Sequence, residues 1–195
     1  MKLKRRTYLQ AAAGIVVIGL LAWMVSRGLE RLAGLQEESG GGATGTAAPA
    51  ADVPHITATL YYGSTDGQSL VPVRREVALA EGLVPQGREI LGAQLGDAPS
   101  PFVSVIPEGT MLRAFYVTDR GDAFVDLSQE ASSRHPGGSS TELLTVFAIV
   151  NAVTANLPTI QRVQILIDGC EADTLAGHVD LRRPLQPDLS IVREP

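Results

Sequence analysis

Cysteine is almost absent from this chain. Cys170 is the single cysteine among 195 residues, so the chain offers no partner for an intrachain disulfide. A zinc site built from several cysteines is excluded for the same reason. The count leaves the redox compartment of the protein open.

Basic residues are scarce in the C-terminal part of the sequence. Six of the sixteen Lys and Arg residues precede residue 34, whereas twenty of the twenty-one acidic residues follow Glu30. From Gly34 onward ten basic residues stand against twenty acidic ones, a formal charge of -10. Such a body repels phosphate backbones, so no nucleic-acid partner is expected.

Two motifs of catalytic and nucleotide-binding sites are missing. Gly137-Gly138 precedes a predicted helix, but no Gly-Lys-Ser/Thr follows, as a phosphate-binding loop would require. Ser139 and Ser140 lie close to His135, but no G-x-S-x-G nucleophile elbow surrounds them. A loop that simply leads into a helix is the preferred interpretation of this region.

One long apolar run lies near the N-terminus. From Tyr8 to Val25 the only strongly polar side chain is Gln10. A helix over this run is about 27 Å long, close to the hydrocarbon thickness of about 30 Å. The sequence therefore predicts a transmembrane anchor at residues 8–27, preceded by a basic cytoplasmic segment at residues 1–7.

The flanking charges predict the orientation of this anchor. Four basic residues precede the run, while Arg27 and Arg31 follow it and are partly offset by Glu30. The positive-inside rule then places the N-terminus in the cytoplasm and the C-terminal body outside, as in a single-pass protein of the cell membrane.

Two alternatives to a retained anchor stay open. A cleaved signal peptide would release the body after export. Residues 5–9, RRTYL, also resemble a twin-arginine export signal. No cysteine stands directly after the run, since the single cysteine is Cys170, and this argues against a lipid-anchored lipoprotein.

A linker is predicted between the anchor and the body, at residues 28–54. Its second part, Gln36 to Pro54, is rich in Gly, Ala, Ser and Pro and poor in bulky apolar side chains. Such a composition cannot bury enough surface to offset the entropy of ordering. As a flexible tether this part has a root-mean-square reach of about 24 Å.

Residues 55–195 are expected to form one α+β domain. Period-two alternation and turn residues predict strands at 55–62, 70–78, 111–118, 123–128 and 162–168, with a shorter extended run at 102–106. Helical spacing predicts helices at 85–95 and from Ser139 to about Pro158. Ser139 and Glu142 are predicted to form a capping box at the start of the second helix. The expected architecture is a mixed β-sheet of about five strands with two main helices packed on one face.

Five sequence blocks in this domain follow the order and approximate spacing of a known family. They are FVDLS, GGSSTELL, IVNAVT, VQILIDG and DTLAGHVDLRRPL. Through them residues 55–185 resemble the GerMN domain, named after bacterial sporulation and spore germination proteins. The resemblance implies a non-catalytic envelope domain, similar in fold to modules of ring-forming sporulation and secretion machines.

Four polar residues are the candidates for contact with a ligand or partner. His178 and Asp180 are two positions apart in GHVDL, so on an extended segment they face the same way. Asp168 and Glu142 would complete the set only if the fold brought them close. The alternative is that His178 holds the tail through a backbone hydrogen bond. Two ligands are too few for a usual metal site, and neither a metal nor a cofactor is expected.

A cysteine nucleophile is the alternative chemistry. Cys170 could pair with His178 or His135, but Asp168 and Glu171 flank it and oppose formation of the thiolate. The protein is therefore predicted not to be an enzyme.

The predicted function is binding of an envelope protein complex or of a cell-wall component such as peptidoglycan. Self-assembly of the domain into a ring or filament is one alternative. An envelope hydrolase that uses Cys170, His178 and Asp180 is the other.

Overall fold

The computed structural model describes residues 54–194. The predicted anchor at residues 8–27 and nearly all of the linker at 28–54 lie outside the described residues. Within residues 54–194, no helix has both the length and the apolar character that crossing a bilayer requires.

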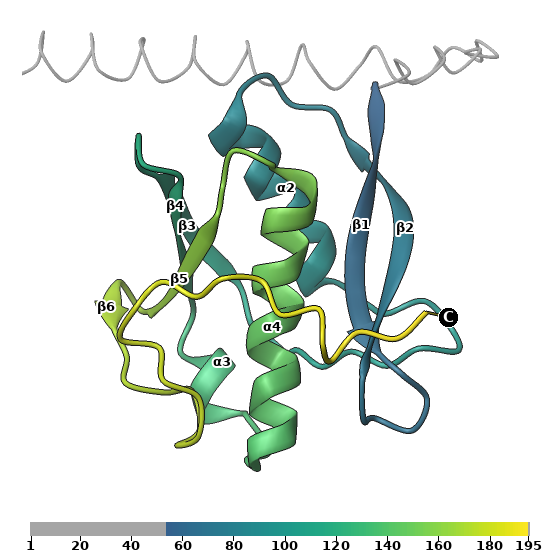
Figure 1. The fold of residues 1–195 in the computed structure, drawn as a ribbon, viewed down its shortest axis with the longest axis vertical. Helices are drawn as coiled ribbons and strands as arrows, with labels where there is room; N and C mark the ends of the chain where they lie inside the picture. The colour runs from purple at the N-terminus through teal and green to yellow at the C-terminus, as the bar shows by residue number, and fades with distance from the viewer. Residues whose placement is uncertain (1–53, 195) are drawn as a thin grey trace, which may run out of the picture. The chain divides into compact units, whose positions relative to one another are not determined.

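In the described chain, pairs of consecutive strands are separated by helices (Figure 1). In order, the elements are β1 (His55–Gly63), β2 (Leu70–Ala78), α2 (Leu83–Leu95), β3 (Leu112–Val117), β4 (Asp122–Leu127), α3 (Glu130–Ser133), α4 (Ser139–Asn156), β5 (Arg162–Ile167) and β6 (Cys170–Glu171). The five predicted strands and both predicted main helices are confirmed, with ends that differ by no more than two residues. The extended run at 102–106 forms only an isolated bridge between Val103 and Gly63.

The strands form two sheets, so the prediction of a single mixed sheet is wrong. β1 and β2 pair as an antiparallel hairpin, and the second sheet has the order β3-β4-β5-β6. β4 and β5 are parallel, whereas β3 and β6 pair antiparallel to their neighbours. Parallel neighbours need a crossover connection, and α4 supplies it.

Side-chain amides from the helices explain why β1 does not join the second sheet. Tyr61 N–H donates to Gln94 Oε1 at 2.8 Å, and Gln94 Nε2 donates back to the Tyr61 carbonyl at 2.7 Å. Asn156 forms the same pair of bonds with Thr59, at 2.8 Å each. These carboxamides satisfy backbone groups that would otherwise bond a third strand.

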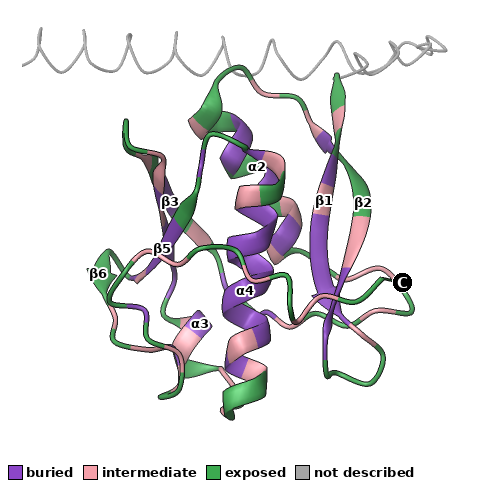
Figure 2. Ribbon diagram, in the orientation of Figure 1, coloured by how far each residue is buried: buried purple, intermediate pink, exposed green. Residues whose placement is uncertain are grey.

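The two long helices lie between the sheets instead of covering one face of a single sheet. α4 packs against β1, α2 and β5, while α2 packs against β1, β2 and β3 (Figure 1). Because it has neighbours on several sides, α4 is buried at every position from Leu144 to Val153 (Figure 2). A helix in this position is apolar around most of its circumference.

Candidate functional site

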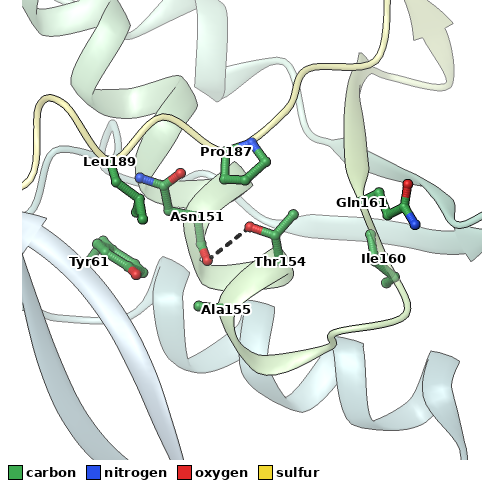
Figure 3. A pocket seen from close by; sticks show the side chains of 8 residues that line it. All are labelled: Tyr61, Asn151, Thr154, Ala155, Ile160, Gln161, Pro187 and Leu189. Atoms are coloured by element: carbon green, nitrogen blue, oxygen red, sulfur yellow. Dashed lines mark hydrogen bonds between the residues drawn. The ribbon is translucent and has the colours of Figure 1, made fainter.

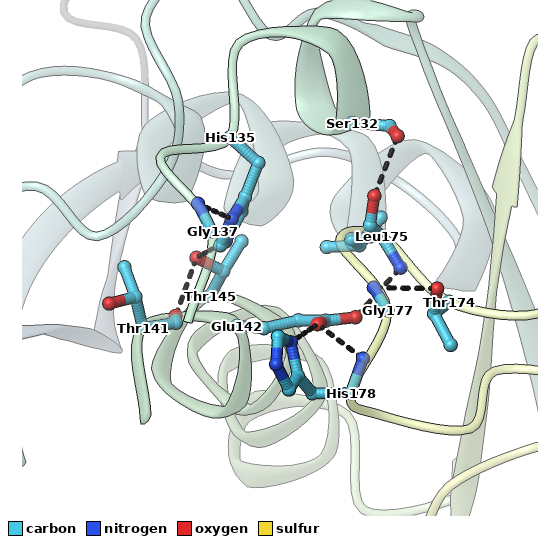
Figure 4. A network of polar contacts seen from close by, with 10 residues as sticks. All are labelled: Ser132, His135, Gly137, Thr141, Glu142, Thr145, Thr174, Leu175, Gly177 and His178. Atoms are coloured by element: carbon cyan, nitrogen blue, oxygen red, sulfur yellow. Dashed lines mark hydrogen bonds and ion pairs between the residues drawn. The ribbon is translucent and has the colours of Figure 1, made fainter. Parts of the chain in front are cut away.

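A buried carboxylate joins the start of α4 to the C-terminal loop. Glu142 is fully buried, and its Oε1 accepts from the Leu175 N–H at 2.8 Å. Its Oε2 accepts from the His178 N–H at 2.8 Å and lies 3.2 Å from His178 Nδ1. Ser132 supports the same loop by donating to the Leu175 carbonyl at 2.6 Å. We call Glu142 with loop 175–179 the carboxylate latch (Figure 4).

The predicted capping box is wrong, because the latch uses the Glu142 carboxylate. The N-cap residue is Gly138, with φ of 91°, and no side chain caps the helix. Ser139 is already the first residue of α4. A carboxylate gains more from several convergent N–H donors than from one N–H at its own helix end.

The latch donors keep Glu142 ionised in spite of its burial. Burial by itself raises the pKa of this carboxyl, because it disfavours the charged form. Backbone N–H groups from the loop, at Ala176, His178, Val179 and Leu175, outweigh that effect and lower the pKa below its ordinary value of 4.5. The buried side chain is therefore a carboxylate anion that backbone N–H groups of the loop stabilise.

Acid is expected to release the latch. Because the folded-state pKa of Glu142 lies below the unfolded value, its stabilisation is complete above about pH 4.5 and is lost as pH falls through the folded value. Urea unfolding between pH 7 and pH 3 should show the free energy of unfolding falling more steeply for the natural chain than for Glu142→Gln. If the free energy of unfolding depended on pH in the same way in both proteins, Glu142 would not be the group responsible.

A second histidine lies beside the latch, where it is held in one tautomer. His135 Nδ1 accepts from the Gly137 N–H at 3.0 Å, which leaves the proton of the neutral ring on Nε2, 3.1 Å from Thr145 Oγ1. The Thr145 hydroxyl in turn donates to the Val105 carbonyl at 2.6 Å. Burial lowers the pKa of His135, so the ring is neutral at neutral pH.

The four candidate contact residues do not form one site. Only Glu142 and His178 meet. Asp168 pairs with Arg113, whose Nη1 lies 2.6 Å from Asp168 Oδ1. Asp180 accepts from the Arg182 guanidinium at 2.9 and 2.8 Å and from the Arg182 N–H at 3.0 Å, and these bonds lower the pKa of Asp180. Within residues 54–194, no cluster of three or more His, Cys, Asp or Glu side chains could hold a metal ion.

Cys170 is not hydrogen-bonded to either histidine in the described part of the chain. It is exposed and lies on β6, paired with Ile167 of β5. The His178 ring contacts Glu142, and the His135 ring contacts Gly137 and Thr145.

A pocket of about 280 Å³ opens between α4, β1 and the C-terminal tail (Figure 3). Its lining is largely apolar, with Tyr61 and Ile160 on the domain side and Pro187 and Leu189 on the tail. Burial raises the pKa of Tyr61. This pocket was not predicted, because the tail and α4 are distant in sequence.

Asn151 holds the tail over this pocket. Although it lies in the middle of α4, Asn151 is fully buried. Its Nδ2 donates to the Asp188 carbonyl at 2.8 Å, and its Oδ1 accepts from the Asp188 N–H at 3.0 Å. The tail then continues to β2, where the Leu70 N–H donates to the Ile191 carbonyl at 2.8 Å.

Replacing Asn151 with alanine is expected to free the tail. Loss of two hydrogen bonds should lower the free energy of unfolding by about 1–2 kcal/mol. Hydrogen exchange should rise at residues 188–193. Thr154→Ala is the control, because Thr154 also lines the pocket but its hydroxyl donates within α4, to Val150 at 2.9 Å. Equal hydrogen exchange at residues 188–193 in both variants would show that Asn151 does not hold the tail.

The fold and the latch define a small α+β domain whose C-terminal loop is fixed by a buried anion from its central helix. The chain belongs to the Germane family, described as sporulation and spore germination, whose family model matches residues 59–173. This confirms the GerMN resemblance. The latch joins two of the sequence blocks that suggested the resemblance: GGSSTELL, which lies inside the matched range, and LAGHVDL at residues 175–181, which lies just beyond it.

Solved structures share this fold. A Clostridium perfringens protein described as a lipoprotein is 24% identical, with 69% of this chain and 89% of that chain covered and a TM-score of 0.50. The tandem GerMN domains of the sporulation protein GerM from Bacillus subtilis are 20% identical, with a TM-score of 0.51; the match spans 70% of this chain and 46% of that one. No curated protein matches the sequence.

Proposed function

We propose that this is a membrane-anchored, extracytoplasmic GerMN-domain protein that binds an envelope protein complex or a cell-wall component without catalysing a reaction. The observation that carries the proposal is a family domain that follows a basic-flanked apolar run and a linker. Sporulation or germination is the setting that the family description supports.

The geometry of the polar residues supports binding over chemistry. Glu142 and His178 stabilise a loop, while Asp168 and Asp180 form intramolecular ion pairs. Each carboxylate therefore already has a structural partner. The solved structure described as a lipoprotein is consistent with a place at an envelope membrane.

The location is tested with reporters fused after Pro195. A phosphatase that folds only outside the cytoplasm should be active, and a reporter that works only inside should be silent. The reverse pattern would overturn the proposal. Fusions to a chain that lacks residues 8–27 provide the control. In that chain the phosphatase should be silent and the reporter that works only inside should be active.

Binding is tested with the full chain on membranes. We expect it to retain either an envelope protein or sedimenting peptidoglycan, and Glu142→Ala should weaken retention if the ordered loop presents the contact. Peptidoglycan turnover that is abolished when Cys170, His178 and Asp180 are replaced by alanine would instead establish the hydrolase.

A further inference from the structure

β2 presents an open stretch of backbone between two bonded positions. At one end the Leu70 N–H donates to Ile191, and at the other the Ala78 carbonyl accepts from Gln86 Nε2 at 3.1 Å. Alternate residues of a strand direct their backbone groups to the same side, and β1 and β2 pair without a register shift. The backbone groups of Pro72, Arg74 and Glu76 therefore face outward, away from β1.

The outward positions carry opposite charges that the domain does not neutralise. Arg74 and Glu76 are exposed, and within residues 54–194 neither forms an ion pair. Arg75, between them, is turned back toward its own domain. Its Nη1 donates to the Tyr62 hydroxyl and to the Asp97 carbonyl, at 3.0 Å each.

We propose that two copies of this chain associate through their β2 edges, antiparallel, with Arg75 on the two-fold axis. In that register Arg74 lies opposite Glu76 of the second copy, and the symmetry repeats the pair. Opposite charges directly across a strand pair stabilise it. The two hairpins then form one continuous four-stranded sheet, and each open edge covers the other.

The hydrogen-bonding groups match in the same register. Pro72 lacks an N–H and lies opposite Ala78 of the second copy, whose carbonyl already accepts from Gln86. Pro72 therefore lacks a donor at the one position where the opposite carbonyl, that of Ala78, already has a hydrogen bond. The Ala78 N–H is directed outward and can donate to the Pro72 carbonyl across the interface.

Neighbouring registers lack this complementarity. Sliding the strands by two residues one way places Arg74 opposite Arg74 of the second copy. Sliding them the other way places Glu76 opposite Glu76, and it directs the Arg74 N–H at the Ala78 carbonyl that Gln86 already binds. Like charges directly opposite each other are destabilising. Of these three registers, only the one with Arg75 on the axis makes the edge complementary to itself.

Single cysteines test the register in the full chain, reconstituted in phospholipid vesicles with Cys170 replaced by serine. Under mild oxidation Arg75→Cys should form a disulfide-linked dimer, because residues on the axis come within bonding distance. Arg74→Cys and Glu76→Cys should cross-link about tenfold less. Absence of the Arg75→Cys dimer, or faster cross-linking at either neighbour, would overturn the proposal.

Charge exchange tests the pairing without a cysteine at position 75. Energy transfer between chains labelled near Pro195 should fall about tenfold in Arg74→Glu and in Glu76→Arg, since each change places two like-charged pairs across the axis. The double exchange should restore it, and so should mixing the two single variants. Circular dichroism confirms folding of these surface variants. If none of these charge changes altered the energy transfer, the β2 edges would not pair.

Discussion

Replacing Glu142 with alanine is expected to lower the free energy of unfolding by about 3–4 kcal/mol. The change removes the acceptor for the buried Leu175 N–H and for the partly buried His178 N–H, and it leaves both donors without a partner. Each unsatisfied buried donor costs about 1–3 kcal/mol, part of which the loop recovers by moving into water. Urea unfolding at pH 7 measures the loss, and hydrogen exchange at residues 175–179 should rise with it.

Two comparisons separate the latch from a general effect of charge. Glu142→Gln retains the volume and one acceptor oxygen but directs an NH₂ group at backbone donors, so about half of the loss is expected. Glu89→Ala removes an exposed acid from α2 and should change stability by less than about 0.5 kcal/mol. If Glu142→Ala changed the free energy of unfolding as little as Glu89→Ala, the latch would not contribute to stability.

Gly87→Ala should destabilise the protein by about 2–3 kcal/mol, although alanine favours helices. A Cβ at this position in α2 would lie 2.1 Å from Cε1 of Phe115. Phe115 belongs to β3 and is almost completely buried, so its ring has little room to move away. Chemical denaturation measures the loss, which arises from forcing α2 away from the second sheet.

Gly92→Ala provides the matched control in the same helix. A Cβ at Gly92 would have no heavy atom within 4 Å, and the position is exposed. Alanine there removes the helix cost of glycine and should stabilise the protein by about 0.5–1 kcal/mol. A similar change in stability for both variants would show that contact with Phe115 does not constrain α2.

The sequence drew attention to both segments of the latch without indicating that they contact each other. GGSSTELL and LAGHVDL stood out as family blocks, but the spacing of Ser139 and Glu142 favoured a capping box. No local pattern shows that a helix-start glutamate faces a loop 36 positions away. Residue type alone groups Asp168 and Asp180 with Glu142, whereas the fold pairs each of these two aspartates with an arginine.

Gly87 shows the same limit at the level of packing. In the sequence both glycines of α2 reduce helix propensity equally. Only the approach of α2 to Phe115 distinguishes a required glycine from a replaceable one.

The sequence alone determined the order and type of the five main strands and the two long helices, and the family; the short α3 and β6 were not predicted. Alternation, helical spacing and turn residues act over a few positions, so they can be recognised without the fold. The tertiary structure decided the division into two sheets, the burial of α4, the latch and the open β2 edge. These features depend on groups far apart in the chain, such as Asn156 and Thr59, which are separated by 97 positions. Such contacts arise only when packing brings buried polar groups within hydrogen-bonding distance.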